Sequence, residues 1–448
     1  MQENISSYIV ELNGEEVLDV KQMLRAKNPI FQNESILSKE YKPDKIIARN
    51  EQIGELVGYL EPIIRHSSPT NVFIWGGSGV GKTITVEHVV KEINETLEED
   101  DPDNVVDFIK INCSVDNNDS DICSTISSHF SINIPSRGRS VSSSMRLIWK
   151  AINEEAQNHV HYTLILFFDE IDKWNLTKQR SLNSDKAQLD MLYTFTRAFE
   201  NNLITTNNCK IGIITASNRQ DFLTTVENRI NSSAGFCYMN FPCYNENDLC
   251  QILMNRNHAF QPNVITPELI HHVATRVADR YSGDARRALD ILMIAGKITK
   301  DEGCNHITKE HLEKADEKIS LIASGNMIAN FSKHDKLLII ASYLCEQNSV
   351  YPNTGLLQQV YENICKILDL KPSNKATISR KITILSENGV IETKRGLFKG
   401  NTRIIALSDT VVNSIEYIYT KEFKSEIENE KFLIESIIEK GSKKLKRK

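Results

Sequence analysis

The chain has 448 residues, 40% hydrophobic and 25% charged, which is enough for roughly two to four folded domains with ordinary cores. It contains no run of about 18 apolar residues and no basic start followed by an apolar run, which argues against a transmembrane helix and a secretory signal. The nine cysteines form no C-x-x-C pair, so we expect free thiols in a reducing cytoplasm and no zinc ribbon or disulfide scaffold. These features predict a cytoplasmic protein with no membrane partner.

Charge is distributed unevenly along the chain. The net charge of −6, from 53 Lys and Arg against 59 Asp and Glu, does not by itself suggest a nucleic-acid-binding protein. Between Lys333 and Ser408, however, 11 Lys and Arg stand against 6 Asp and Glu, a local net charge of +5. Because electrostatic attraction in ordinary salt acts over roughly 10 Å, the local charge matters more than the global one.

Short apolar runs alternate with helical patterns in the first half of the chain. Residues 1–40 are weakly patterned and predict an arm or a short helix. Five runs rich in β-branched residues follow, at 71–75, 105–111, 163–168, 210–217 and 236–241. Such runs, separated by amphipathic segments, predict an α/β domain over 41–243 with a parallel sheet covered by helices on both faces. Its ligand site should lie beyond the carboxyl ends of the strands.

The second half of the chain predicts two further domains and a tail. Helical spacing at 246–260, 267–279, 283–299 and 308–323 predicts a small all-helical domain over 244–330. Three helices at 335–346, 355–368 and 373–388 precede two strand-like pieces, VIETK and RIIALS, which predicts a winged helix over 331–408. The extension over 409–448 has helix-like stretches, and we expect its basic end, GSKKLKRK, to be frayed.

The most specific motif follows the first predicted strand. GGSGVGKT, from Gly76 to Thr83, fits G-x-x-x-x-G-K-[ST] between a strand and a helix, a context that disfavours a merely flexible glycine turn. Glycines let backbone N–H groups converge on phosphate oxygens at a helix N-terminus. Lys82 would neutralise the β- and γ-phosphates, and the Thr83 hydroxyl would bind Mg²⁺. The predicted ATP- or ADP-binding residues of this loop are Gly76, Gly77, Ser78, Gly79, Val80, Gly81, Lys82 and Thr83.

Two later strands also end in polar residues. Asp169 and Glu170 follow the buried run TLILFF, so we predict that Asp169 holds the Mg²⁺ shell and Glu170 polarises the attacking water. Asn218 follows IITAS and can orient that water, although a helix cap or a turn asparagine is an alternative interpretation.

At this point the order of motifs resembles that of AAA+ ATPases, and more narrowly that of the archaeal origin-recognition (Orc/Cdc-type) replication initiators. SILSKEYKPDKIIARNEQIGEL (35–56) resembles the family's first box, NFPCYNENDLCQILMNR (240–256) its link into the lid, and YSGDARRALDIL (281–292) its sensor-2 helix. The similarity runs from about residue 30 to residue 408.

The resemblance implies roles for residues that the spacing alone does not assign. It implies that Arg49, Tyr244 and Arg256 contact the adenine nucleotide, that Arg229 is the arginine finger, and that Arg286 is the sensor-2 arginine. The segment around 115–150 resembles the initiator-specific insert, whose Arg137 and Arg139 would approach DNA. In three places the chain departs from the family. Gly77 stands where relatives often have lysine or proline, no proline precedes Arg229, and the two wing glycines are more widely spaced than in relatives.

The predicted winged helix supplies the remaining DNA-binding candidates. Its third helix typically enters the major groove, and Arg380 is the best candidate for reading a guanine edge. Lysines, arginines and hydroxyls suit phosphate contacts, although winged helices also bind proteins. The helix candidates are Lys375, Thr377, Ser379, Arg380 and Lys381, and the wing candidates are Lys394, Arg395, Lys399 and Arg403.

Taken together, the sequence predicts a nucleoid-associated initiator that binds duplex origin DNA and helps to recruit or load an MCM-type replicative helicase, alone or with other initiator subunits. ATP hydrolysis should be slow, because a switch needs changes of state and no high throughput. Three alternatives remain open: a clamp-loader or helicase-loader subunit, an ATP-switched transcriptional regulator or defence protein, and a winged helix that binds only protein.

Overall fold

The computed structural model describes residues 9–12, 15–18, 29–132, 140–174, 190–222, 234–395, 403–408 and 411–446. The chain divides into two compact units, Met1–Lys309 and Glu310–Lys448. In the described part of the chain, no helix has the length and apolar character that a membrane span requires.

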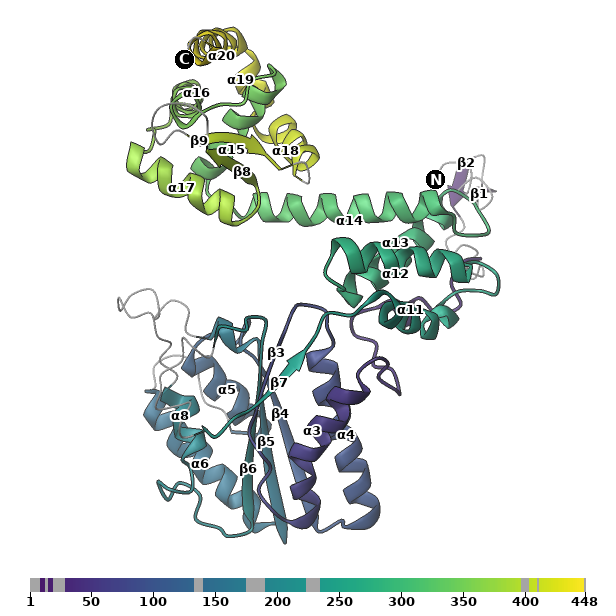
Figure 1. Cartoon of the computed structure of the whole chain (residues 1–448). Coiled ribbons are helices and arrows are strands. Elements are labelled where there is room, and N and C mark those ends of the chain that lie inside the picture. Colours follow the sequence, from purple (N-terminus) through teal and green to yellow (C-terminus); the bar gives the residue numbers. More distant parts are fainter. Residues whose placement is uncertain are drawn as a thin grey trace. The chain divides into compact units, whose positions relative to one another are not determined.

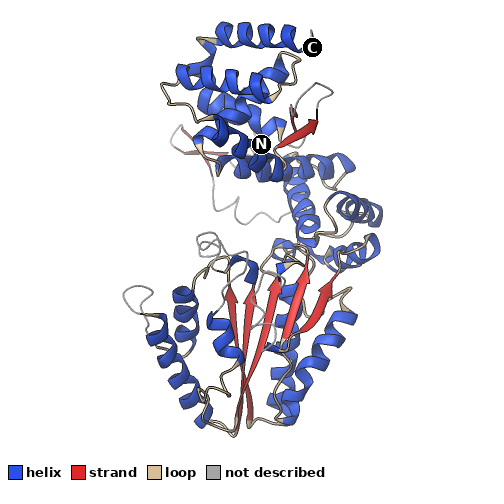
Figure 2. Cartoon of the chain, turned by 60° about the vertical axis from the view of Figure 1, so that its left-hand side comes forward, coloured by secondary structure: helices blue, strands red, loops and turns tan. Residues whose placement is uncertain are grey.

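The first unit is built on a five-stranded parallel sheet in the order β4-β5-β6-β3-β7 (Figures 1 and 2). All five predicted strands are confirmed. Their bounds are Val72–Gly76 (β3), Asn104–Asn112 (β4), His161–Asp169 (β5), Cys209–Ser217 (β6) and Cys237–Phe241 (β7). Helices cover both faces of the sheet (Figure 1), which explains why the interior strands β3, β5 and β6 are nearly continuous buried runs. The edge strands β4 and β7 are less completely buried.

Alternate side chains of the interior strand β5 enter two different cores. Leu164, Leu166 and Phe168 pack with α5 (Asp119–His129), α6 (Val141–Gln157) and α8 (Asp190–Thr196). Ile165 and Phe167 pack on the opposite face with α3 (Asn50–Leu60) and α4 (Lys82–Asp100). This alternation between the faces of the sheet is the ordinary geometry of a strand. Asp169, the last residue of β5, lies at the carboxyl edge of the sheet.

The N-terminal region differs from its prediction. Ile9–Leu12 (β1) and Glu15–Leu18 (β2) form an antiparallel pair, so the expected short helix is wrong for these residues. The only described helical turn before residue 40 is the 3-10 helix η2 (Glu34–Leu37). The segment before η2 is bound to the helical domain: the Gln32 and Asn33 amides donate to the Ala259 carbonyl at 2.9 and 3.0 Å.

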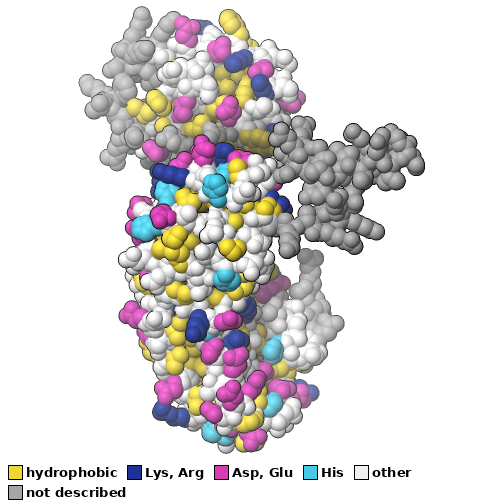
Figure 3. Space-filling view, turned by 90° about the vertical axis from the view of Figure 1, so that its right-hand side faces the viewer, with side chains coloured by type: hydrophobic (Ala, Val, Ile, Leu, Met, Phe, Trp, Pro, Cys, Tyr) yellow, Lys and Arg dark blue, Asp and Glu magenta, His cyan; other side chains and the backbone are white. Residues whose placement is uncertain are grey.

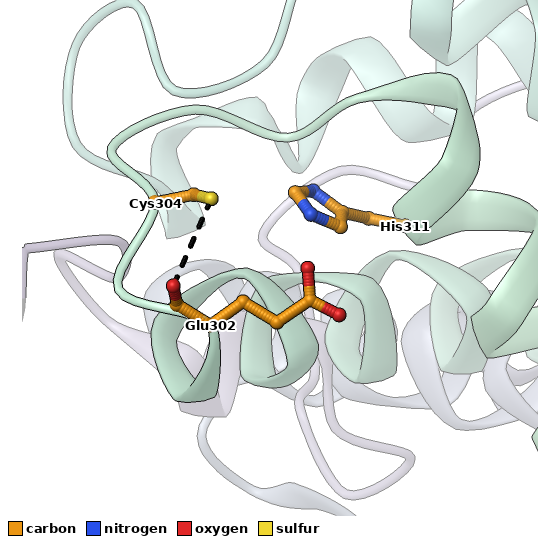
Figure 4. A group of neighbouring side chains, drawn as sticks. All are labelled: Glu302, Cys304 and His311. Carbon is orange, nitrogen blue, oxygen red and sulfur yellow. Dashed lines mark hydrogen bonds between the residues drawn. The ribbon is translucent and has the colours of Figure 1, made fainter. Parts of the chain in front are cut away.

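The predicted helical lid follows β7. It contains α11 (Glu246–Asn255), the short 3-10 helix η5 (Asn257–Ala259), α12 (Pro267–Arg280) and α13 (Ala285–Asp301). The side chain of Asp284 accepts hydrogen bonds from the Arg286 and Arg287 amides and so caps α13. Beyond the other end of α13, the Cys304 thiol donates to the Glu302 carbonyl at 3.9 Å (Figure 4). All nine cysteines are free thiols.

The second unit begins with α14 (Lys309–Ala329), apart from its first residue. Its winged helix consists of α15 (Lys333–Gln347), α16 (Thr354–Ile367), α17 (Lys375–Glu387) and the antiparallel pair β8 (Ile391–Arg395) and β9 (Arg403–Leu407). Ile328, at the end of α14, is buried in the same core. The last third of α14 therefore packs with the winged helix, although its spacing had suggested the lid.

The C-terminal extension is part of this second core. It forms α18 (Val412–Ile418), the π-helical segment η6 (Tyr419–Phe423), α19 (Lys424–Glu428) and α20 (Lys431–Lys446). Ile427, Ile434 and Ile438 are buried with the winged-helix residues. The expectation of a frayed end is wrong as far as Lys446, because α20 packs on α16 so closely that a Cβ at Gly441 would lie 2.4 Å from Leu356.

Candidate functional site

The phosphate-binding loop joins β3 to α4 and needs glycine at two positions. Gly79 and Gly81 have φ angles of +69° and +89°, in the left-handed region that side chains disfavour. A Cβ at Gly79 would lie 1.8 Å from a carboxylate oxygen of Asp284, and one at Gly81 would lie 2.5 Å from the Tyr244 hydroxyl. The lid and its linker therefore close directly onto the loop.

Lys82 is held at the centre of the site. Its side chain is buried, and Nζ donates to the carbonyls of Gly76 and Gly77 at 2.9 and 2.7 Å and to Asn218 Oδ1 at 2.8 Å. Burial lowers the pKa of Lys82, against the attraction of Asp169 and together with the repulsion of Arg286. A direct hydrogen bond thus joins the loop to Asn218 at the end of β6, a contact that the sequence did not predict.

Thr83 and Asp169 meet as the sequence predicts. The Thr83 hydroxyl donates to Asp169 Oδ2 at 2.7 Å, and the Glu170 amide donates to Asp169 Oδ1 at 3.0 Å. Asp169 is 7% exposed, and Glu170 lines the cavity beside it. Hydroxyl and carboxylate oxygens beside a phosphate loop are the ligands that Mg²⁺ prefers, so these side chains fit the ion.

Asp172 is a site residue that the sequence reasoning missed. It is 3% exposed, and its Oδ1 accepts hydrogen bonds from the Ser217 hydroxyl at 3.0 Å and from the Asn218 amide at 3.2 Å. It therefore fixes the end of β6 from which Asn218 reaches Lys82. Its position in the run DEID, just after a buried strand, could have marked Asp172 as a site residue. Its contact with the end of β6, however, follows only from the pairing of β5 with β6 in the fold.

These side chains line a cavity of about 520 Å³, a volume typical of small-molecule and cofactor sites. Its described lining residues include most of the predicted ones, namely Ser78, Gly79, Val80, Gly81, Lys82, Thr83, Asp169, Glu170, Asn218, Tyr244, Arg256 and Arg286. Gly76 and Gly77 lie outside this lining and serve as carbonyl acceptors for Lys82. Arg229 lies outside the described residues.

Arg49, for which the resemblance implies a contact with the nucleotide, packs against the loop. Its side chain is 3% exposed and lies behind the loop, away from the cavity lining. The guanidinium donates to the carbonyls of Val80 and Pro242 and stacks on the Tyr244 ring, with Cζ 3.7 Å from the ring centroid. Arg49 is therefore placed to support the loop from outside the cavity.

The N-terminal segment supplies a wall of the cavity that was not predicted residue by residue. Residues 37–43 and 45–47 line the cavity. Arg256 donates to the Ile36 carbonyl at 3.0 Å and stacks on the Tyr41 ring at 4.4 Å, so it binds this segment to the lid while also lining the cavity. The run KEYKPDKII could have predicted this wall, because it lies within the segment 35–56 that resembles the family's first box.

Glu87, on α4, joins the same segment to the sheet. Its carboxylate takes ion pairs from Lys42 at 2.7 Å and from Lys110 at 2.8 Å. Burial opposes ionisation, but the hydrogen bonds from Lys110 and Lys42 outweigh it and lower the pKa of Glu87. This carboxylate therefore stays charged at neutral pH beside the cavity.

The DNA-binding candidates of the winged helix are placed unequally. On α17, Lys375, Ser379 and Arg380 are exposed, whereas Thr377 is half-buried. Lys381 is half-buried, and its side chain faces α15: Nζ forms an ion pair with Asp335 at 2.6 Å and donates to the Ser332 hydroxyl at 3.0 Å. The side chains of Lys394, Arg395, Lys399, Arg403, Arg137 and Arg139 lie outside the described residues.

Three family models match successive parts of the chain. Residues 72–238 match the ATPase family associated with various cellular activities (AAA). Residues 250–317 match the Cdc6 AAA+ ATPase-type lid domain, and residues 326–413 match the CDC6 C-terminal winged helix domain. The predicted fold class, a parallel-sheet AAA+ core with a helical lid and a winged helix, is confirmed.

Whole-chain relatives agree with this order of domains. The ORC1-type DNA replication protein of Thermococcus onnurineus is 33% identical over 398 residues, covering 86% of this chain and 90% of that protein. The one from Pyrococcus horikoshii is 32% identical over 414 residues, covering 89% and 93%. The structure of the Aeropyrum pernix ORC1 protein in complex with DNA has the same fold, with a TM-score of 0.74, 24% identity, and coverage of 90% and 100%. The chain thus belongs to the family of ORC1-type DNA replication proteins.

Proposed function

We propose that this protein is a replication initiator that binds ATP or ADP in the cavity described above, binds duplex origin DNA through its winged helix, and uses the nucleotide as a switch. The observation that carries the proposal is the joint arrangement of Lys82, Thr83, Asp169 and Asn218. Three separate segments, namely the glycine-rich loop with the start of α4, the end of β5 and the end of β6, bring together a cation, a hydroxyl, a carboxylate and an amide. This is the set of groups that phosphoryl transfer requires.

Each side chain has a distinct task in this proposal. The amides of the loop and Lys82 bind the phosphates, while Thr83 and Asp169 hold Mg²⁺, which supplies charge neutralisation when it is bound. Glu170 polarises the attacking water and Asn218 orients it. Arg286, exposed at the start of α13 and lining the cavity, closes over the γ-phosphate, and Arg229 acts from a neighbouring subunit. We expect slow turnover, because the lid and the N-terminal segment cover the site.

The DNA side of the proposal rests on α17. Arg380, Lys375 and Ser379 are exposed on this helix, which begins at the capping residue Asn374. The similar Aeropyrum pernix protein has been captured in complex with DNA. On the face seen in Figure 3, acidic and basic side chains are interspersed. The chain has a net charge of −6, whereas α17 is basic. This contrast favours DNA binding through the α17 surface.

Initiator function also implies protein partners. We propose that the DNA-bound form recruits or helps to load an MCM-type replicative helicase, and that other initiator subunits join it at the origin. These steps would take place at the nucleoid. Co-purification of the helicase with the ATP-bound form on origin DNA, and its loss with ADP, would support this part of the proposal.

Fluorescence anisotropy with origin-proximal and random duplexes at several salt concentrations tests the DNA-binding function. We compare the wild type with Arg380→Ala and Arg403→Ala, and use Lys431→Ala on the exposed start of α20 as the matched control. Salt-dependent binding with an origin preference that Arg380→Ala weakens, and that the control leaves intact, supports the initiator. Equal or absent binding to both duplexes contradicts it and leaves a loader or a protein-binding switch. A footprint spread over promoters would favour the transcriptional regulator.

A further inference from the structure

Arg49 stands where three segments of the first unit meet. It immediately precedes α3, and its guanidinium reaches both the phosphate loop and the linker to the lid. Nε donates to the Val80 carbonyl at 2.9 Å, and Nη2 donates to the Pro242 carbonyl at 2.7 Å. Val80 lies between the two positive-φ glycines of the loop, and Pro242 is the first residue after β7. One side chain thus joins the loop to the start of the linker.

The chemistry of this buried cation requires arginine. Arg49 is 3% exposed and forms no ion pair with any described residue. Carbonyl dipoles and the Tyr244 ring beneath the guanidinium compensate its charge. A buried charge is costly when its hydrogen bonds are removed. Lysine, with a compact ammonium, cannot donate in two fixed directions and stack on a ring at the same time.

The bond to Val80 orients a phosphate-binding donor. The Val80 carbonyl and the Gly81 N–H belong to one peptide unit, and no described peptide bond is cis. In a trans peptide these two groups point in opposite directions. Because Arg49 holds the carbonyl from behind the loop, the Gly81 N–H points away from Arg49, and Gly81 lines the cavity. Backbone N–H groups at such a loop are the donors that bind phosphate.

The lid contacts the same few atoms. The Ala285 amide, at the start of α13, donates to the Gly79 carbonyl at 3.3 Å. Gly283 packs so closely that a Cβ there would lie 2.1 Å from the Tyr244 carbonyl oxygen. Tyr244 is also the residue on which Arg49 stacks. Loop, linker and lid therefore form one continuous set of contacts around Arg49.

We infer that Arg49 is a positioning residue that couples phosphate binding to docking of the lid: it orients the Gly81 amide and ties that peptide to the linker at Pro242. The inference rests on the proposed nucleotide binding and adds that docking of the lid regulates this binding. Coupling of this kind is reciprocal, so a docked lid raises nucleotide affinity and a bound nucleotide stabilises the docked lid by the same factor. Arg49 accomplishes this without lining the cavity.

Two measurements on the full chain test the coupling with MgADP as the probe. Isothermal titration gives the ADP affinity, and hydrogen exchange gives the protection of the α13 amides with and without saturating ADP. For Arg49→Lys we expect ADP affinity to fall by about tenfold to a hundredfold, the loss typical of a charge-assisted hydrogen bond. We also expect saturating ADP to add little protection to α13. Arg280→Lys, at an exposed site on α12, is the matched control and should behave as the wild type.

A second variant covers the case in which Arg49→Lys does not fold, which circular dichroism would reveal. Ala285→Pro removes only the amide that donates to Gly79, at the first position of α13, where proline is tolerated. It should likewise reduce the protection that ADP gives to α13. If a folded variant shows the full ADP-dependent protection of the wild type, the inference is wrong, even if its ADP affinity is reduced. If the wild type itself binds no ADP, the proposed function fails instead.

Discussion

The carboxylate of Asp172 accepts a hydrogen bond from the backbone amide of Asn218 at 3.2 Å, although 46 residues separate them in the chain. The same oxygen accepts a hydrogen bond from the Ser217 hydroxyl. The two hydrogen bonds therefore fix the backbone where β6 ends. Asn218 in turn accepts from Lys82. A buried carboxylate outside the cavity lining thereby sets the position of Asn218, the side chain for which we propose orientation of the attacking water.

Asp172→Ala should slow ATP hydrolysis by about tenfold to a hundredfold, because a small displacement of an orienting group is that costly. ADP affinity should change much less, since Lys82 keeps its two carbonyl partners. Asp172→Asn retains an acceptor oxygen and should restore much of the rate. Single-turnover hydrolysis beside ADP titration measures both quantities. Asp221→Ala, an exposed neighbour, is the control; equal loss in both variants would contradict the assigned role.

Gly79→Ala should abolish lid docking on the phosphate loop. The added Cβ would lie 1.8 Å from Asp284 at a backbone angle that alanine disfavours, so the loop or the lid must shift. We expect ADP to raise the thermal midpoint of this variant far less than that of the wild type. Gly54→Ala in α3 is the matched control, because its Cβ meets nothing within 4 Å. It should stabilise the protein by roughly 0.5–1 kcal/mol and leave the ADP effect unchanged.

Lys381 and Arg380 are neighbours with different expected effects. Lys381→Ala leaves Asp335 without its ion-pair partner and should lower the denaturation midpoint of the second unit, with little change in the salt dependence of DNA binding. Arg380→Ala should leave stability unchanged. If Arg380 contacts a phosphate, the slope of log affinity against log salt should become shallower by about one; if it contacts a base, the preference for that base should be lost. Urea denaturation and anisotropy separate the two. A large loss of salt dependence in Lys381→Ala would show that this lysine leaves Asp335 to bind DNA.

The pair of His129 and Asp107 should make the stability of the first unit depend on pH. A hydrogen bond to Asp107, opposed by burial and aided by the attraction of that carboxylate, raises the pKa of His129 above its ordinary value of 6.5. Because the folded pKa is the higher one, the stabilisation is fully present below pH 6.5 and is lost as pH rises through the folded pKa. His129→Gln should therefore destabilise the protein more at pH 6 than at pH 8.5 in urea titrations. The same loss at both pH values would exclude a role for the charged imidazole.

The local sequence was sufficient for the elements of the sheet, the lid and the winged helix, and for much of the site. Apolar runs bounded by polar residues gave the five strands of the sheet, because parallel strands covered on both faces must be apolar throughout. The loop from Gly76 to Thr83 and the carboxylates at the end of β5 were found because phosphate and Mg²⁺ chemistry admits few residue types at a strand end. Helical spacing predicted the lid, and three helices followed by two strand-like pieces predicted the winged helix.

Only the tertiary structure decided what each buried charge does. Three charged side chains have hydrogen-bond partners far away in the chain. The partners of Arg49 are 31 and 193 residues away, and those of Lys381 and Asp172 are each 46 residues away. Arg49 supports the loop from behind, Lys381 pairs with Asp335, and Asp172 fixes Asn218. Sequence periodicity cannot predict such partners. It indicates which face of a helix or strand is buried, but not which residues that face contacts. The packed C-terminal helices follow the same logic, since a short basic end resembles a solvated tail until a facing helix such as α16 is in place.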